Sequence, residues 1–256
     1  MKALFTWGLR RLPRPWLLQA SKWLRPFLDV FYRGKNHLDP INGKSYRTFL
    51  PYGYGKTRPN VLSPGTLSLE RHRLLWIYLC QETDFFNKQA KVLHLAPEQA
   101  FLGRFRKLKH LNYTTADLNS PLADIKADIC NLPFANNTFD WVLCNHVLEH
   151  IEDDQKAMSE LFRVLKPGGR AILQVPLDTK RTDTYEDFNI RAPHERARAF
   201  GQYDHVRVYG LDYVNRLQAV GFEAALIPYA KELTSEERHL YRIPQNEQIP
   251  TAVKPR

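Results

Sequence analysis

The stretch Thr138-Phe139-Asp140-Trp141-Val142-Leu143-Cys144-Asn145 is followed by a polar turn, a helical segment at Asp153–Leu165 and a second apolar run at Arg170–Val175. The first run is mostly apolar at consecutive positions, which is typical of a strand buried on both faces. A strand, a helix and another strand in this order predict parallel neighbours joined by a crossover helix. The sequence therefore predicts an α/β fold.

The same alternation continues on both sides of this stretch, beginning with a helical segment around Leu74–Cys80. Strands are expected at Lys91–Ala96, Tyr113–Ala116, Asp124–Ala127 and Phe222–Pro228, with Gln248–Lys254 as a last strand at an edge of the sheet; helices are expected from Pro97 to about Leu108 and at Leu211–Val220. Strands that alternate with helices form a doubly wound, parallel sheet. Ligands of such sheets lie at the carboxyl ends of the strands.

The composition of the 256 residues fits a folded domain, with 43% hydrophobic and 25% charged residues,. The longest apolar run, Leu74–Cys80, has seven residues, which is far short of a membrane span,. No uninterrupted apolar core of a cleavable signal is found in residues 1–35,. Cys80, Cys130 and Cys144 lack paired spacing and are predicted to be buried thiols, which favours a reducing, cytoplasmic location,.

Residues 1–35 form a basic arm, which holds eight Lys and Arg side chains against one acid, Asp29, in a chain of net charge +10. One face of a helix would carry Trp16, Ala20, Trp23, Leu24, Phe27 and Phe31,. Pro26 is expected to kink or break this helix. An aromatic face opposite basic residues is typical of a helix at a membrane interface. An equal alternative is that this apolar face docks on the body of the protein or on a second subunit, and RNA binding by the arm is a third interpretation.

Four motifs then follow one another, each in the strand or helix context predicted above. They are Leu132-Pro133-Phe134, Asn137–Leu143, His146–Ile151 and Leu165–Gly169. In this order they resemble class I S-adenosylmethionine (SAM)-dependent methyltransferases, and the similarity runs from about residue 90 to about residue 230. The resemblance implies a Rossmann-like sheet of seven strands with the last strand antiparallel, and SAM as the cofactor across the ends of the first four strands.

The resemblance also implies which residues bind SAM. Asp117 matches the acid that accepts hydrogen bonds from both ribose hydroxyls, a task that suits a carboxylate, and Leu118 follows it. Asp128 matches the acid that binds the adenine amine, and Ile129 the residue that packs on the ring. The alternative for each acid is a carboxylate that caps a turn or a helix.

The turn after the first strand departs from the family pattern, because it reads His94-Leu95-Ala96-Pro97-Glu98 and has no glycine before Gly103. The absence of G-x-G-x-x-G argues against NAD and FAD. Methyltransferases with an N-terminal zinc knuckle resemble this chain in the same turn, which implies that His94, Ala96 and Glu98 border SAM, with Glu98 near its amino group. Weakened or lost SAM binding is the alternative.

Residues 36–70 also resemble those knuckle-bearing bacterial enzymes, at Tyr46–Gly53 and Ser68–Arg73. Cysteines in place of Asp39, Asn42, Ser63 and Thr66 would give the zinc-ribbon spacing C-x2-C-x20-C-x2-C,. The four residues carry no thiolate, so no metal is predicted here. The segment is interpreted as a degenerate knuckle-like loop, or as a loop with accidental spacing, that precedes a methyltransferase domain at residues 71–256.

Methyl transfer needs an aligned acceptor, the exclusion of water and, for some acceptors, a base. Asn145 and His146 follow the fourth strand, where the family borders the methionine part of SAM and the acceptor. The catalytic candidates are His146, Glu149 and His205, with His146 favoured over its neighbour His150 and over His194. The polar and aromatic stretches Tyr185–Arg191 and Gly201–Gly210 are expected to hold the acceptor, although a solvated loop is the alternative.

Two motifs that would indicate nucleic-acid bases as acceptors are missing. No N-P-P-Y-type tetrad follows the fourth strand, and Cys144 does not follow a proline. The expected activity is therefore O- or N-methylation of a small molecule, a glycan or a lipid-linked intermediate. The expected location is the cytoplasm, with the inner face of the membrane as the site if the arm binds lipid. The alternatives are a silent SAM-binding or adaptor module and an RNA methyltransferase.

Overall fold

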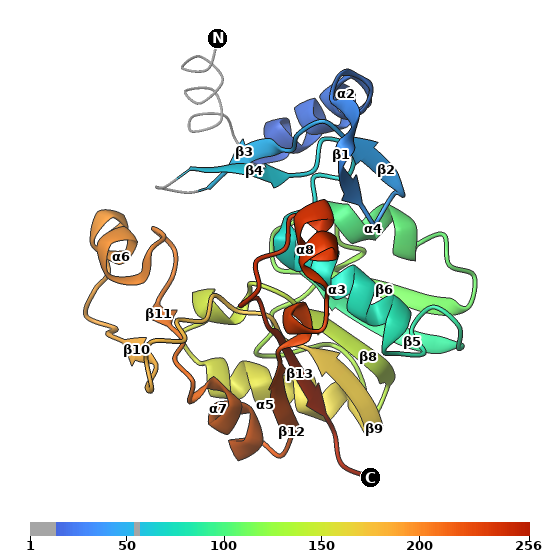
Figure 1. Ribbon diagram of the computed structural model, residues 1–256. Coiled ribbons are helices and arrows are strands. Elements are labelled where there is room, and N and C mark those ends of the chain that lie inside the picture. Colours follow the sequence, from blue (N-terminus) through green and yellow to red (C-terminus); the bar gives the residue numbers. More distant parts are fainter. Residues whose placement is uncertain (1–13, 54–56) are drawn as a thin grey trace.

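The computed structural model in Figure 1 describes residues 14–53 and 57–256, and its centre is a seven-stranded sheet. The strands are β5 (Ala90–Leu95), β6 (Leu111–Asp117), β7 (Ile125–Lys126), β8 (Phe139–Cys144), β9 (Leu165–Ile172), β12 (Glu223–Ile227) and β13 (Ile249–Val253), in the order β12-β13-β9-β8-β5-β6-β7. β13 runs antiparallel to both of its neighbours, and β5–β9 run parallel. The predicted doubly wound α/β fold with an antiparallel last strand is confirmed.

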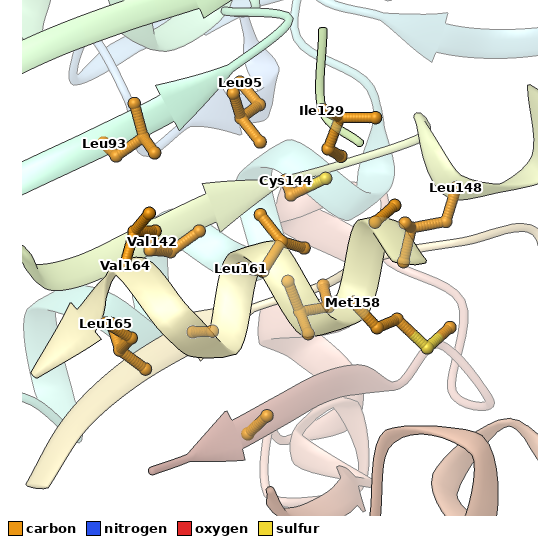
Figure 2. Packing of buried hydrophobic residues seen from close by; sticks show 14 of the residues in the cluster. Leu93, Leu95, Ile129, Val142, Cys144, Leu148, Met158, Leu161, Val164 and Leu165 are labelled. Atoms are coloured by element: carbon orange, nitrogen blue, oxygen red, sulfur yellow. The ribbon is translucent and has the colours of Figure 1, made fainter. Parts of the chain in front are cut away.

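Helices cover both faces of the sheet because strand residues alternate between two apolar clusters. On β8, Trp141 and Leu143 join the cluster under α3 (Glu70–Gln81) and α4 (Gln99–Phe105). Val142 and Cys144 face the opposite cluster, under α5 (Asp154–Val164) and α7 (Tyr213–Ala219). Figure 2 shows this second cluster, in which α5 lies on the sheet. A short helix, η2 (Tyr229–Lys231), and α8 (Ser235–Tyr241) precede β13.

Several expected details of the elements are wrong. β13 lies between β12 and β9, so β12 and not the last strand forms that edge of the sheet. β9 ends at Ile172, three residues before the expected end, because its ladder to β8 and β13 stops there. Cys80 is exposed and Cys130 is partly exposed, so only Cys144 is the expected buried thiol. The expected limits of α4 are two residues too early and about three too late, and those of α7 are two residues too early and one too late.

Residues 36–70 are more ordered than the expected loop, since they form two antiparallel strand pairs. These are β1 (Arg33–Asp39) with β2 (Lys44–Tyr46) and β3 (Leu50–Tyr52) with β4 (Arg58–Leu62). Arg73 ties the segment to the body: its buried guanidinium donates to the carbonyls of Val61 and Ser68 and to two carbonyls after α8. Burial lowers the pKa of Arg73 to about 10, so it keeps its charge at neutral pH.

Three of the four knuckle positions meet in one buried cluster around Asp39, which we call the Asp39 cluster. The Oδ2 atom of Asp39 accepts hydrogen bonds from Ser63 Oγ at 2.5 Å, from Ser68 Oγ at 3.3 Å and from Thr66 Oγ1. Its Oδ1 accepts from the amide of Ile41 at 2.9 Å. Asp39 and Ser63 are fully buried. A carboxylate surrounded by donors therefore joins the two hairpins where a knuckle would have a metal.

The expected helix of the arm is present as α2 (Arg14–Phe31), and it continues through Pro26 without a break. The part of the arm before residue 14 and the side chains of Trp16 and Ala20 lie outside the described residues. Asp29 anchors the end of α2, where it accepts from Tyr46 Oη at 2.5 Å and from Lys44 Nζ at 2.6 Å. In the rest of the stripe, Trp23 and Phe27 are 77% and 74% exposed.

The segment between β9 and α7 contains β10 (Tyr185–Glu186), α6 (Pro193–Phe200) and β11 (Arg207–Val208), and we call it the insert. Arg207 clamps it to the body: the fully buried guanidinium contacts Glu186 at 2.8 Å and donates to three carbonyls in and after η1 (Leu148–His150). In the part of the chain that the structure describes, no helix has the length and apolarity needed to cross a membrane.

We expect Asp39→Ala to lower the free energy of unfolding by about 2–4 kcal/mol, because it leaves three buried hydroxyls and an amide without their acceptor. Urea denaturation measures this loss. Asp84→Ala is the matched control, since Asp84 is 52% exposed and takes part only in a surface ion pair. An equal, small loss in both variants would contradict the role of the Asp39 cluster.

Candidate active site

The turn after β5 has the backbone conformation that glycine usually supplies, although no glycine is present. Ala96 has a φ of +46°, in the left-handed region that non-glycine residues seldom adopt,. Its amide donates to the carbonyl of Ala116, which ties the turn to the end of β6 at 2.9 Å. The methyl group is the smallest side chain that such a position can carry. The turn thus keeps the shape expected of a SAM-binding loop.

Glu98 is the centre of a hydrogen-bond network that joins the ends of β5 and β8. One carboxylate oxygen contacts His94 Nε2, and the other accepts from Asn145 Nδ2 at 3.0 Å. His94 is fully buried, and its Nδ1 contacts Tyr113 Oη at 2.6 Å. Burial opposes the charge of Glu98, but His94 and Asn145 together lower its pKa below the usual value. His94, which lies within β5, therefore holds the carboxylate of Glu98 in position.

The turn after β8 is also strained, because His146 has a φ of +55°. Its amide donates to the carbonyl of Gln174 at 2.7 Å, beyond the end of β9. Asn145 is buried and accepts from the amide of Gln174 at 3.4 Å. Strained residues of this kind persist where the surrounding structure holds them, and they gather at active sites. The ends of β5, β8 and β9 are thus linked through Glu98, Asn145 and His146.

His146 is held by a buried carboxylate. Its Nδ1 lies 3.1 Å from Glu149 Oε1, and Glu149 is only 1% exposed. When the imidazole is neutral, a proton on Nδ1 shared with Glu149 leaves the lone pair on Nε2. Burial and the neighbouring Arg71 lower the pKa of His146, and burial raises the pKa of Glu149.

A cavity of about 380 Å³ opens beside His146. Its wall includes Gln174–Leu177, which follow β9, and the segment before β13. Charged and amide side chains gather around it: Arg58, Glu70, Arg71, Gln174, Glu247 and Gln248. Arg58 pairs with Glu70 at 2.5 Å, whereas Arg71 has no ion pair among the described residues. Burial and the nearby Glu70 raise the pKa of Glu247. The cavity is therefore polar. It includes His146, which the resemblance places near the acceptor, but no residue of Tyr185–Arg191 or Gly201–Gly210 lines it.

The acids expected to bind the ribose and adenine lie outside this cavity, at the ends of the neighbouring strands. Asp117 ends β6, and its Oδ1 accepts from the amides of Asn119 and Ser120 at 2.7 and 2.5 Å. Leu118 beside it is 51% exposed. Asp128 is exposed and accepts from the amide of Cys130 at 2.9 Å. Both acids therefore also serve as turn carboxylates.

Ile129 and His205 are less accessible than expected for residues that contact ligands. Ile129 is 7% exposed and packs in the cluster under α5, as Figure 2 shows. His205 is 8% exposed, its Nδ1 lies 3.3 Å from the carbonyl of Phe200, and it does not line the cavity. The contact of Ile129 with the adenine ring and the catalytic role of His205 therefore remain predictions.

Sequence reasoning missed several residues of the cavity. Gln174 lies two residues beyond the end of β9, whereas the sequence pattern predicts a strand that continues to Val175. Arg71 and Glu70 begin α3, and Glu247 and Gln248 precede β13. Such residues are brought together only by tertiary packing, and no local signal identifies them.

Comparison with known proteins agrees with this geometry. Residues 82–173 match the family model of the methyltransferase domain. These residues therefore form a methyltransferase domain. It is 31% identical over 127 residues to a ubiquinone/menaquinone biosynthesis C-methyltransferase of Haemophilus ducreyi, covering 42% of this chain and 49% of that protein. A 2-phytyl-1,4-naphtoquinone methyltransferase of Nostoc punctiforme is 29% identical over 129 residues, covering 50% of this chain and 43% of that protein.

The chain spans about half or less of the length of these curated relatives. Among solved structures, the [4+2]-cyclase SpnF is similar in fold, with a TM-score of 0.50, 17% identity and coverage of 85% of this chain and 91% of that one. That protein is named for a cyclisation, so the fold by itself does not establish the reaction.

The residues present fit SAM, the cofactor of this family. The left-handed turn at Ala96 leaves room for close approach at the end of β5. Only Oδ1 of Asp117 is used by the turn, and no hydrogen bond to its Oδ2 is found within residues 14–53 and 57–256. A free carboxylate oxygen at this position suits a ribose hydroxyl.

The lowered pKa of Glu98 predicts how stability depends on pH. A carboxyl whose pKa is lower in the folded chain stabilises it above the unfolded value of about 4.5, and this contribution disappears as the pH falls through the folded pKa. We expect Glu98→Gln to lower the free energy of unfolding by about 1–3 kcal/mol at pH 7. The difference from the unaltered protein should shrink toward pH 4 in urea denaturation.

Glu232→Gln is the control for this measurement, because Glu232 is exposed. It should change the stability little at either pH. A Glu98→Gln effect of the same size at pH 7 and pH 4 would show that the charge of Glu98 does not contribute.

Proposed function

We propose that this chain transfers a methyl group from SAM to a small molecule bound in the cavity beside His146. The observation that carries the proposal is the pairing of His146 with the buried Glu149 at the wall of a polar cavity, at the strand ends where the family places methyl donor and acceptor. Bound SAM supplies a methyl group that is already activated by its sulfonium. The protein then has to align the acceptor, exclude water and remove a proton where the acceptor requires it.

His146 is the proposed base. Glu149 holds its Nδ1, so the lone pair of Nε2 is available to a hydroxyl or amine of the acceptor,. Glu149 acts through His146 and is a positioning residue. The backbone hydrogen bond from His146 to Gln174 keeps the ring at the mouth of the cavity.

The polar wall of the cavity supports an acceptor with hydroxyl, amine or carbonyl groups. O- or N-methylation of such a group needs only the loss of its proton to His146. The relatives are named as methyltransferases of quinones, and one as a C-methyltransferase. Loss of a proton from a ring hydroxyl also makes the neighbouring ring carbon nucleophilic, so the same base serves carbon methylation. A quinol is therefore the first acceptor to test.

We expect Asp117→Ala to weaken binding of S-adenosylhomocysteine, the demethylated product, by about tenfold or more, because a ribose hydroxyl loses a charged acceptor. We expect His146→Ala to retain this binding and to lose about 10²–10⁴-fold in kcat. Calorimetry measures the first effect. Transfer of labelled methyl from SAM to reduced demethylmenaquinone and to simple phenols and amines measures the second.

His194→Ala is the control, because His194 is exposed on α6 in the insert. Full turnover in His146→Ala would contradict the role of His146 as the base. Tight binding of S-adenosylhomocysteine without transfer to any acceptor would instead favour the silent SAM-binding module.

We also propose that α2 contacts the membrane surface from the cytoplasmic side, where it would give access to a lipid-linked acceptor. The support is its exposed apolar stripe, with Trp23, Phe27 and Phe31 at 77%, 74% and 67% exposure, on a basic arm. The end of the helix is fixed by Asp29, so the stripe is presented by the body of the protein and not folded onto it. Aromatic side chains of this kind insert at the interface, and the positive charges attract anionic lipids.

We expect the double variant Trp23→Ser/Phe27→Ser to weaken binding to vesicles of phosphatidylglycerol and phosphatidylcholine by about tenfold or more, because it removes two large apolar side chains. Sedimentation with the vesicles measures this. Tyr52→Ser, at a 49% exposed tyrosine of β3, is the control. Unchanged vesicle binding in the double variant would show that this face of α2 does not contact the membrane. If the unaltered protein is a dimer and the double variant is a monomer, a second subunit covers the apolar stripe instead.

A further inference from the structure

Glu149, His150 and His205 form a cluster next to His146, and none of the three lines the cavity. One ligand atom from each residue lies within 4.8 Å of those of the other two. The rings of His150 and His205 lie 4.8 Å apart, edge to face. Glu149 and His150 belong to η1, and His205 belongs to the insert, so the cluster bridges two separate parts of the domain.

Both imidazoles have one nitrogen occupied by a backbone carbonyl. His150 Nδ1 lies 3.2 Å from the carbonyl of Asp204, and His205 Nδ1 lies 3.3 Å from that of Phe200. A carbonyl only accepts, so each Nδ1 carries the proton and each Nε2 has a free lone pair. The side chain of Asp204 also approaches His150 Nδ1, at 3.5 Å. Histidines that bind metals are held in this way, by a carbonyl or a carboxylate on the other ring nitrogen.

The third member of the cluster has an orphaned oxygen. Glu149 Oε1 bonds to His146, but the buried Oε2 has no hydrogen-bond partner among the described residues. A buried carboxylate oxygen without a donor is costly unless a cation compensates it.

We propose that Glu149, His150 and His205 bind a divalent transition-metal ion of the zinc class. Two imidazole nitrogens and one carboxylate oxygen are ligands that Zn²⁺ and its first-row neighbours prefer. In a tetrahedral zinc site the ligand atoms lie about 3.3 Å apart, so ligand atoms that lie within 4.8 Å of one another have to approach by at most about 1.5 Å to bind the ion. This site is distinct from the knuckle positions, where no metal is predicted.

The ion would fasten the insert to η1 beside the acceptor cavity. The amide of Val206 already donates to the carbonyl of Glu149 at 2.9 Å, and Arg207 continues the contact. A metal on Oε2 of Glu149 would also fix the carboxylate whose other oxygen holds His146. The ion therefore has a structural role, and it does not need to contact the acceptor.

The test uses the full chain, stripped of metal with a chelator and titrated with Zn²⁺ and with Co²⁺. We expect about one equivalent of Zn²⁺ per chain by calorimetry and elemental analysis. Co²⁺ should give the visible absorption bands of a low-symmetry site with nitrogen and oxygen ligands. His205→Gln and His150→Gln should each weaken Zn²⁺ binding by about tenfold or more.

His194→Gln is the matched control and should bind Zn²⁺ as the unaltered protein does. Binding of S-adenosylhomocysteine shows that each variant is folded. If His205→Gln does not fold, Glu149→Gln provides the same test, because glutamine keeps the size of the side chain. No stoichiometric binding, or binding that both histidine variants retain, would overturn the proposal whether or not methyl transfer is found.

Discussion

The site depends on the partly buried carboxylate of Glu98, because it joins the turn after β5 to the turn after β8. Glu98 follows β5, whereas its partner Asn145 follows β8, and His94 supports it from inside the strand. Asn145 in turn accepts from Gln174 beyond β9. Backbone pairing already places these strands side by side. Glu98 adds a side-chain link between the turns that follow β5 and β8, and Asn145 extends this link to the segment after β9.

The sequence could predict this region only to the level of the strands and their ends. Apolar runs at β5 and β8 indicate parallel strands, and parallel strands place Glu98 and Asn145 at one edge. Whether Ala96 would adopt a glycine-like conformation could not be predicted, since that strain is held by the hydrogen bond to Ala116 and by packing elsewhere. The order of the strands could not be predicted either. β13 pairs with β9 through long-range contacts, although its local sequence pattern is typical of an edge strand.

The Asp39 cluster shows how a hydrogen-bonded carboxylate can join two hairpins where zinc would hold a knuckle. A metal with four thiolates links the hairpins through strong bonds from few residues. Here Asp39 accepts from two serines, a threonine and an amide, and the buried guanidinium of Arg73 joins the same segment to the body. The spacing of the four positions was visible in the sequence. The donor role of Ser68 was not, because its position depends on the turn at Thr66.

Buried charge also holds the insert against the body of the domain. Arg207 is fully buried, and it satisfies carbonyls in and after η1 while it pairs with Glu186. Arg216 adds a second pair to Glu186 at 2.7 Å and one to Asp154 at 2.9 Å. Each guanidinium contacts both the body and the insert, so moving the insert would leave several buried groups unpaired at once. The insert is therefore expected to attach to the body or detach from it as a unit. Glu149 lies between His146 and the insert, so a displacement of the insert is expected to move His146 as well.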